Sequence, residues 1–465
     1  MSWRAFFGGA LAGAAGILAG ERLLRRTLAS GPAAPAVSEP YVHSYWLESA
    51  GFYERRPNRP LIEARTSADV VIVGGGYTGL SAAWHLAKRF PARRIVLLEA
   101  ARCGYGASGR NGGQALATNL NFAGFPDEWA AAGRRISLMG LEILRDYAGR
   151  YGLAFDLRPA EYLIAAIGDR HRRALEETAR TLEALGIRPR RLDREEVRQE
   201  LSTEAFTAAL AYDDGSAALH PARLALGMKR LAEDRGVEIY EQTRVLRLSG
   251  GKTVEVETEF GSVRAPVAVV ATNAYTHLLG IFRRAYFPLV TSIVATEPAD
   301  PARLTAAGLG PHRMLVTAER SLHYLQVTPD GRLILGGGGA AHAYGGQVHG
   351  GNHKAQIGRL PGFLERTWPH LAGLRVTHGW SGVICYTRDG LPSAGRLPGR
   401  PNVYYALGYS GEGVSFAVAC GKILADLIAG APLAPEARVV VGRRLPYVPS
   451  DPLRSALFAA RRLFL

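Results

Sequence analysis

Cysteine is scarce in this chain of 465 residues, and the few that occur are far apart. Cys103, Cys385 and Cys420 form no C-x-x-C pair. The sequence therefore indicates neither a disulfide framework nor a zinc site, and we expect no bound metal. Such cysteine usage is typical of a reducing compartment, so we expect a cytoplasmic protein.

The sequence also lacks a basic run interleaved with aromatic residues. The net charge is +15, but the arginines are spread along the whole chain. This distribution argues against nucleic-acid binding. Two explanations of the positive excess stay open: attraction to a membrane surface of anionic lipid, and arginines on the solvated faces of a globular protein.

Long hydrophobic runs are missing as well. Residues 5–20 are apolar and uncharged, but a helix of that length covers about 24 Å, which is short for a membrane span. Three interpretations remain: a membrane anchor, a secretory signal, and an apolar helix of a soluble protein. The charged segment 21–26 lies where the cleavage site of a signal peptide would be expected, which argues against a secretory signal. If residues 5–20 span, the arginines that follow keep the rest of the chain on the cytoplasmic side, attached to the inner face of the membrane.

Glycine, in contrast, is abundant, and three glycines organise the region from residue 69 to residue 114. Residues 70–73 form a short β-branched run that predicts a buried parallel strand. Gly74, Gly76 and Gly79 follow in G-x-G-x-x-G spacing, and the apolar spacing then becomes helical. A second apolar strand, residues 95–98, ends in Glu99. This order of elements predicts a βαβ unit that binds a dinucleotide.

Glu99 bears on which dinucleotide binds. A carboxylate at the end of the second strand accepts from a ribose 2′-hydroxyl and disfavours a 2′-phosphate, so NADP is not the expected cofactor. The spacing alone leaves FAD and NAD open. After residue 271 no second G-x-G-x-x-G follows, which argues against reductases that bind two dinucleotides.

The stretch after Glu99, AARCGYGASGRNGGQ, is rich in small residues and hydrogen-bond donors. Together with the residues IVGGGYTGLSAA before it and with two later blocks, WSGVICYTRDGLPSAGR at 380–396 and YYALGYSGEGV at 404–414, it resembles the FAD-dependent oxidoreductases of the D-amino-acid oxidase group. The resemblance covers about residues 41–430. It implies FAD that is held without a covalent bond. Some members of the group link the flavin to a cysteine in a C-x-Y-T sequence, whereas Cys385 directly precedes Tyr386 and Thr387 and does not have this spacing.

The resemblance also implies an activity. We expect oxidation of an amine or amino acid at its C–N bond, with hydride transfer to flavin N5 and hydrolysis of the resulting imine. The electrons would then pass to oxygen or to a quinone. Two alternatives stay open: oxidation of a hydroxy acid on the same scaffold, and a flavin-binding assembly factor without turnover.

The expected fold is α/β, with a Rossmann-like FAD-binding domain and an inserted, mainly antiparallel β-rich substrate domain. The expected divisions are an N-terminal apolar segment and linker (1–40), three parts of the FAD-binding domain (41–150, 217–285 and 386–435), two parts of the substrate domain (151–216 and 286–385), and a basic tail (436–465). Residues 155–167 read as paired strands. The tail residues 452–465 could form an amphipathic helix, either on a membrane surface or docked on the protein.

The cofactor-binding residues that these motifs predict fall in five stretches of the sequence. They are Gly74, Gly76, Tyr77, Thr78 and Gly79; Glu99, Ala100, Arg102, Ala107, Ser108, Gly109, Arg110, Asn111, Gly112, Gly113 and Gln114; Val245, Ala271 and Thr272; and Gly408, Tyr409, Ser410, Gly411, Glu412, Gly413 and Val414.

Two aromatic residues are predicted to act at the substrate. Tyr324 matches an aromatic position of the resembling group, whereas Leu325 and Gln326 depart from it, and Trp380 opens the W-x-G block. His220 precedes a helix that starts with Pro221, so it is expected to cap that helix rather than to act as a base. Glu412 replaces a histidine of close relatives, and we expect it to face outward or to pair with a base.

Overall fold

The computed structural model describes residues 44–61, 65–319, 321–348 and 353–463. The N-terminal apolar segment lies outside these residues. In the described part of the chain, no helix combines the length and the apolarity needed to cross a membrane. The described residues form one compact body.

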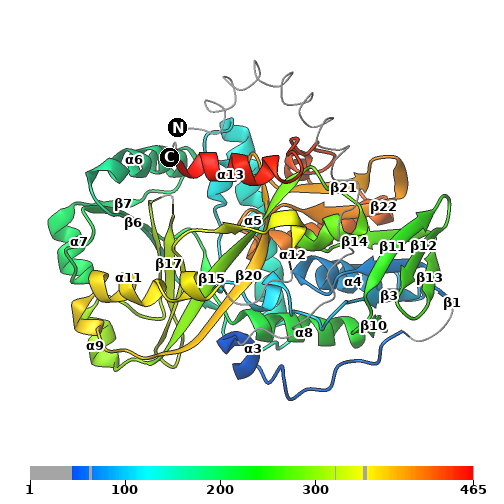
Figure 1. Cartoon of the computed structure of the whole chain (residues 1–465), viewed down its shortest axis with the longest axis horizontal. Coiled ribbons are helices and arrows are strands. Elements are labelled where there is room, and N and C mark those ends of the chain that lie inside the picture. Colours follow the sequence, from blue (N-terminus) through cyan, green and yellow to red (C-terminus); the bar gives the residue numbers. More distant parts are fainter. Residues whose placement is uncertain (1–43, 62–64, 320, 349–352, 464–465) are drawn as a thin grey trace. The chain divides into compact units, whose positions relative to one another are not determined.

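A six-stranded sheet forms the centre of one half of this body (Figure 1). Its strand order is β10-β3-β2-β14-β22-β21, with the first five strands parallel and β21 antiparallel to β22. The bounds are β2 Val70–Val73, β3 Ile95–Leu98, β10 Glu238–Tyr240, β14 Val267–Val270, β21 Ser393–Leu397 and β22 Arg400–Leu407. Strands β2 and β3 thus have the bounds that the sequence predicts.

Both faces of this sheet are covered, which explains the unbroken apolar runs in its strands. Val70 and Ile72 face a helical layer, whereas Val71 and Val73 face a second sheet. The helical layer consists of α4 (Tyr77–Arg89), α5 (Asp127–Gly149), α8 (Pro221–Glu233) and α12 (Val414–Ala429). The second sheet has the order β1-β13-β12-β11, with bounds Arg65–Ser67, Ser262–Ala265, Val254–Thr258 and Val245–Gly250.

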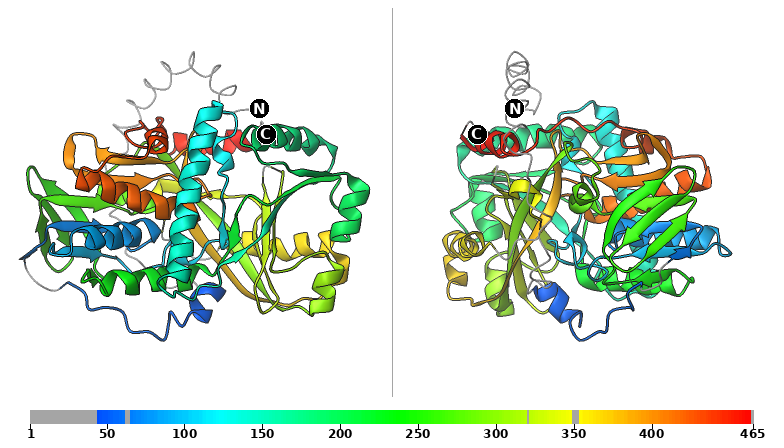
Figure 2. Two further views of the ribbon diagram at one scale, coloured as in Figure 1. Left: turned by 180° about the vertical axis from the view of Figure 1, so that it is seen from behind. Right: turned by 45° about the vertical axis from the view of Figure 1, so that its right-hand side comes forward.

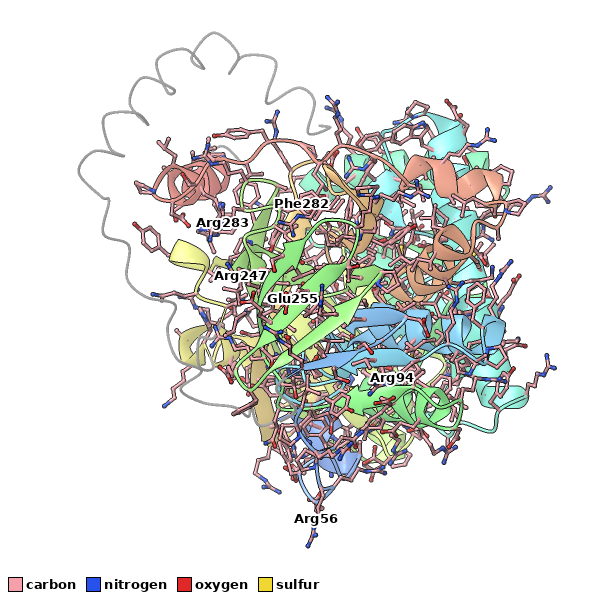
Figure 3. The ribbon with its side chains drawn as sticks, turned by 90° about the vertical axis from the view of Figure 1, so that its right-hand side faces the viewer. Arg56, Arg94, Arg247, Glu255, Phe282 and Arg283 are labelled. Carbon is pink, nitrogen blue, oxygen red and sulfur yellow. The ribbon has the colours of Figure 1, made fainter. Side chains whose placement is uncertain are left out.

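Arginines on this second sheet show where part of the positive charge lies. Arg247 and Glu255 lie on its outer side (Figure 3), and Arg247 pairs with Glu257 at 2.7 Å. Arg94, beside the six-stranded sheet, pairs with Glu238 at 2.7 Å. These contacts agree with arginines on solvated faces, one of the two explanations of the net charge.

The other half of the body is built on a nine-stranded, mainly antiparallel sheet. Its order is β19-β15-β18-β17-β16-β6-β8-β7, and β20 pairs with β15. The bounds are β6 Glu161–Ala166, β7 Arg190–Leu192, β8 Ala208–Tyr212, β15 Tyr286–Pro298, β16 Arg313–Thr317, β17 His323–Val327, β18 Arg332–Gly337, β19 Ala341–His342 and β20 Val376–Thr387. Helices α6 (Arg172–Ala184), α7 (Arg194–Leu201), α9 (Pro301–Ala306), α10 (Lys354–Ile357) and α11 (Leu360–Thr367) belong to this half. The α/β class and the β-rich insertion are as predicted.

One prediction of strand pairing is wrong. Within residues 155–167, β5 (Arg158–Pro159) pairs with β9 (Ala217–Ala218), whereas β6 pairs with β8 and β16. The two strands therefore belong to different sheets, because alternation along a chain does not specify the pairing partner. Strand β9 also pairs with β4 (Gln114–Ala115), so this small sheet joins the segment after Gly113 to the start of the insertion.

The C-terminal helix α13 (Leu453–Leu463) is docked on the protein. Arg454 is buried and donates to the carbonyl oxygens of Pro449 and Arg283. Phe458 lies against the rings of Phe287 and His342. Residues 453–460 therefore form a docked helix, which is one of the two alternatives predicted for the tail.

Helix α5 runs past α12 between the two halves (Figure 2), and their closest approach depends on Gly140. A Cβ at Gly140 would lie 1.9 Å from the carbonyl oxygen of Ser415. We expect Gly140→Ala to lower the free energy of unfolding by about 1–3 kcal/mol, because the helices must separate. Gly149→Ala in the same helix meets no atom within 4 Å and is expected to be neutral or slightly stabilising. Equal urea midpoints for the two variants would contradict this account of the interface.

Candidate functional site

Three loops meet at the carboxyl ends of parallel strands β2, β14 and β22. The N–H of Ala271 donates to the carbonyl of Val73 at 2.8 Å, and the N–H of Gly408 donates to Oδ1 of Asn273 at 3.1 Å. Segments 74–76, 271–273 and 408–413 are therefore neighbours in space. In an open α/β sheet this edge is where a ligand crevice is expected.

The glycines of the first loop permit close backbone contacts. Gly74 has φ +109°, and a Cβ there would lie 2.7 Å from the carbonyl oxygen of Ala271. A Cβ at Gly79 would lie 1.9 Å from the carbonyl oxygen of Gly74. Helix α4 thus starts directly against the loop, and Gly76 precedes it without a capping side chain. This arrangement fits a pyrophosphate, which needs a close backbone and a positive helix end.

Glu99 lies beside this loop, as the spacing predicts. Its carboxylate accepts from the N–H of Gly75 at 2.7 Å and from the N–H of Ala101 at 2.9 Å. Burial raises the pKa of Glu99, and these amides oppose the shift. The N–H of Thr243 donates to the carbonyl of Glu99 at 2.9 Å, which brings the segment leading to Val245 next to the acid. The acid and the loop together fit the ribose end of a dinucleotide.

The segment 107–114 is held in place largely by its own polar groups and by two tryptophans. Asn111 donates to the carbonyls of Ala107 and Ser108 at 3.1 and 3.0 Å, and its Oδ1 accepts from the N–H of Gly113 at 2.8 Å. Trp380 Nε1 donates to the carbonyl of Arg110 at 2.8 Å, and Trp46 Nε1 donates to the carbonyl of Asn111 at 2.9 Å.

A role of Trp380 at the substrate stays a prediction. Its side chain is fully buried, and its indole N–H donates to the carbonyl of Arg110, so it supports the segment 107–114. Trp46, in helix α3 (Tyr45–Ser49), has the same role and was not predicted, because no motif of the sequence marks it.

Tyr324 lies where β17 crosses the segment 107–114. A Cβ added at Gly112 would lie 2.5 Å from a carbon of its ring, and one added at Gly336 would lie 2.2 Å from another. The ring therefore packs directly on both glycines. Burial raises the pKa of its hydroxyl, which makes no hydrogen bond among the described residues. Gln326, two residues along on the same face, donates to the carbonyl of Gly112 at 2.5 Å. Gln326, which departs from the resembling group, thus supports the segment 107–114 through this hydrogen bond. Leu325, the other departure, faces the hydrophobic core on the opposite side of the sheet.

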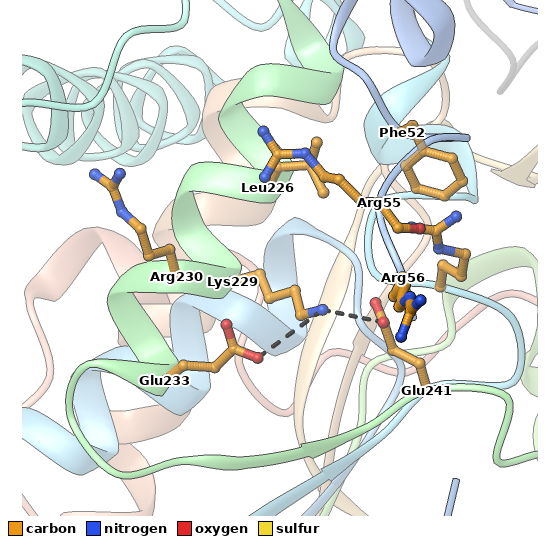
Figure 4. A pocket seen from close by; sticks show the side chains of 9 residues that line it. Phe52, Arg55, Arg56, Leu226, Lys229, Arg230, Glu233 and Glu241 are labelled. Carbon is orange, nitrogen blue, oxygen red and sulfur yellow. Dashed lines mark hydrogen bonds and ion pairs between the residues drawn. The ribbon is translucent and has the colours of Figure 1, made fainter. Parts of the chain in front are cut away.

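Arg102 lies in a pocket on the α8 side of the segment (Figure 4). The pocket has a volume of about 260 Å³ and is lined by Phe52, Arg55, Arg56, Arg102, Leu226, Lys229, Arg230, Glu233 and Glu241. The Arg102 guanidinium stacks on Phe52 at 4.4 Å and donates to the carbonyl of Arg55 at 2.7 Å. The Nε of Arg102 is buried without a hydrogen-bond partner among the described residues, and a contact with the cofactor stays a prediction.

His220 and Cys385 behave as the sequence suggests. The N–H of Arg223 donates to Nδ1 of His220 at 3.3 Å, so the histidine caps helix α8. Burial lowers its pKa to about 3, which keeps the ring neutral. Cys385 is buried, and burial raises the pKa of its thiol, as expected of an unreactive cysteine.

The segment 408–414 leads into helix α12 and lies against the start of α4. The hydroxyls of Tyr409 and Thr78 are 2.6 Å apart. Ser410 has φ +50°, and its Oγ accepts from the N–H of Thr387 at 3.2 Å. The amino end of α12 is thus fixed at the same edge as the three loops.

Glu412 corrects a prediction. It pairs with no base among the described residues, and although the residue is partly exposed, its Oε2 is buried and has no hydrogen-bond partner among them. Burial raises its pKa to about 8, although the backbone amides of Leu120 and Asn121 stabilise its ionised form. The sequence pattern placed Glu412 before a helix but could not show that the segment 119–121 covers it.

Comparison with known proteins agrees with this geometry. Residues 69–427 match the family model described as FAD dependent oxidoreductase (DAO). The chain is 33% identical over 401 residues to gamma-glutamylputrescine oxidoreductase of Escherichia coli (strain K12), which covers 84% of this chain and 89% of the relative. This is the enzyme that the motifs most resemble within the group. Glycine oxidase of Bacillus licheniformis is 24% identical over 387 residues, covering 80% of this chain and 96% of that protein.

Solved structures show the same fold. The crystal structure of glycine oxidase from Geobacillus kaustophilus superposes with a TM-score of 0.71 at 20% identity, covering 82% of this chain and all of that one. The L-proline dehydrogenase structure from P.horikoshii gives a TM-score of 0.66 at 22% identity, covering 83% of this chain and 97% of that one.

The loop at Gly76 provides a test of the cofactor site. We expect Gly76→Val to abolish flavin retention, because a side chain there would occupy the approach to the pyrophosphate and would displace Ser108, whose Oγ is 2.9 Å from a Cβ position on Gly76. The flavin absorbance of the purified protein measures retention, and circular dichroism checks folding. Gly251→Val, where a Cβ meets no atom within 4 Å, is the matched control and should keep its flavin. A folded Gly76→Val protein with full flavin content would reject this site.

Proposed function

This chain belongs to the family of FAD-dependent oxidoreductases, and we propose that it oxidises the C–N bond of an amine or amino acid to an imine, which water then hydrolyses. The observation that carries the proposal is the junction of segments 74–76, 271–273 and 408–413 beside Glu99. The relatives named for amine and amino-acid substrates support the class of substrate.

The described residues would hold FAD without a covalent bond. Gly74, Gly76 and the start of α4 would receive the pyrophosphate, and Glu99 would receive a ribose hydroxyl. FAD supplies the hydride acceptor of the reaction. The amino end of α12 is a positive helix end that can stabilise negative charge on a reduced ring.

The substrate would lie against Tyr324. Its ring belongs to the nine-stranded sheet, whereas Gly112, on which it packs, belongs to the predicted cofactor segment. The tyrosine therefore stands where the two halves of the molecule meet. Its hydroxyl, which is without a partner among the described residues, can bind a polar group of a substrate.

Anaerobic mixing of the purified holoprotein with a panel of amines tests the activity. We expect at least one primary amine or amino acid to bleach the flavin absorbance, since hydride transfer reduces the ring. A hydroxy acid of matched size serves as the control and should leave the spectrum unchanged. Bleaching by the hydroxy acid alone would transfer the assignment to that substrate class, and no bleaching by any compound would favour a protein without turnover.

We further propose that the protein lies in the cytoplasm, attached to the inner face of the membrane, and that it passes electrons to oxygen or to a membrane quinone. Support comes from the uncharged run 5–20 and the arginines after it, which lie outside the described residues. Attachment to a membrane would favour the quinone.

Deletion of residues 1–30 tests the attachment. We expect the whole chain to sediment with membranes and the shortened chain to stay in the supernatant with its flavin and its reducing activity intact, because the described body begins only at residue 44. Ultracentrifugation at low salt without detergent measures the partition. A full-length protein found in the supernatant would reject the anchor. Hydrogen peroxide formation and reduction of a soluble quinone analogue then identify the acceptor.

A further inference from the structure

Three buried polar atoms near the amino end of α12 have no hydrogen-bond partner among the described residues. They are Oε2 of Glu412, Nδ2 of Asn119 and Nδ2 of Asn121. A buried donor or acceptor without a partner costs about 1–3 kcal/mol, and more for a charged group. Three such atoms in one place indicate a surface that is built for a ligand.

The three atoms belong to one cluster. The N–H of Asn121 donates to Oδ1 of Asn119 at 3.0 Å, and the same N–H stabilises the Glu412 carboxylate. The Asn119 side chain is therefore next to the carboxylate, and it is only 4% exposed. Because its Oδ1 is already an acceptor, its Nδ2 is fixed as the free donor.

The cluster lies between the cofactor loops and the nine-stranded sheet. Glu412 follows Tyr409, whose hydroxyl contacts Thr78 at the start of α4. Leu120, which lies between the two asparagines in the chain, packs in the same hydrophobic cluster as Tyr162 of β6 and Tyr212 of β8. The charge of Glu412 contributes to the raised pKa of both tyrosines, after burial. The carboxylate is thus close to both halves of the molecule, where a substrate would lie.

The chemistry of the cluster specifies its ligand. A carboxylate oxygen accepts hydrogen bonds, and an ammonium group is the cationic donor that best offsets its burial. The two amide nitrogens donate, so they need an oxygen acceptor. A group that carries an ammonium and a carbonyl or carboxylate oxygen side by side satisfies all three atoms.

We propose that Glu412, Asn119 and Asn121 form a substrate subsite that receives an ammonium group on the carboxylate and a neighbouring carbonyl or carboxylate oxygen on the two amides. The inference rests on the proposed function and narrows its substrate class to amines with an amino-acid-like group.

A ligand that cannot react separates binding from turnover. α-Aminoisobutyric acid carries an ammonium and a carboxylate but no hydrogen on the carbon beside nitrogen, so it cannot lose a hydride. Its binding to the holoprotein is measured by titration calorimetry and by the shift of the flavin spectrum. We expect Glu412→Gln to weaken this binding by about tenfold or more, because a charged hydrogen bond is lost. Isobutyric acid, which lacks the amine, should bind the two proteins alike.

Glu365→Gln, the same change at an exposed position of α11, is the matched control and should leave the affinity unchanged. Glu412→Gln is nearly isosteric, so the fold should survive; the flavin content and the melting temperature check this. Asn119→Ser shortens the donor and is expected to weaken α-aminoisobutyric acid while sparing simple alkylamines.

The pH dependence gives a readout that a structural role would not produce. The carboxyl must lose its proton before it can hold an ammonium, and its pKa is about 8. Affinity of the wild type should therefore rise by up to about tenfold between about pH 7 and about pH 9, where an aliphatic ammonium stays protonated. The affinity of Glu412→Gln should be flat over this range.

The outcomes distinguish the two proposals. Unchanged affinity in Glu412→Gln, or no binding of α-aminoisobutyric acid to the wild type, overturns the subsite while leaving amine oxidation to the bleaching assay. A displaced flavin potential in Glu412→Gln with unchanged ligand affinity also overturns it, since the cluster would then serve the cofactor. Weakened, pH-independent binding in the variant supports the subsite even if no amine of the panel bleaches the flavin.

Discussion

The close packing of backbone on backbone around Gly74 and Gly79 is the constraint on which the rest of the site depends. A Cβ at Gly79 would lie 1.9 Å from the carbonyl oxygen of Gly74, and one at Gly74 would lie 2.7 Å from that of Ala271. No side chain can be added at either place without moving a strand or a helix. The amino end of α4 is consequently held against the strand ends, and Glu99 comes to face the N–H of Gly75.

The second half of the molecule reaches this edge through contacts that fix one segment. Trp380 of β20 and Trp46 of α3 donate to consecutive carbonyls at residues 110 and 111, and Gln326 of β17 donates to the carbonyl of Gly112. Each of these donors is largely buried. A buried donor that loses its acceptor leaves an unsatisfied group, so the segment and the large sheet stabilise each other. The expected substrate side of the cofactor would in this way be supported by residues that need not touch the substrate.

The local sequence pattern was enough to predict the elements of the βαβ unit, because the signals for these elements lie within their own residues. The strands 70–73 and 95–98 are buried on both faces and therefore read as continuous apolar runs, and the glycine spacing defines the turn between strand and helix. The pairing of residues 158–166 was wrong for the opposite reason: two strands that follow each other belong to different sheets, and only the partner strands decide that. Trp46 went unnoticed since its function depends on a carbonyl 65 residues further along the chain.

Glu412 shows most clearly where local sequence stops being informative. An acid just before a helix ordinarily complements the helix dipole at the surface. Here the segment 119–121, almost 300 positions earlier in the chain, covers the carboxylate and removes water from one of its oxygens. The dipole and two backbone amides favour the charge, but desolvation outweighs them and raises the pKa of the group. A protein keeps such a carboxylate only at a cost in stability, and in the proposed subsite that cost would be offset when a cation enters. An acid could then stand beside the expected flavin site without opposing the reaction, because the bound cation would neutralise its charge.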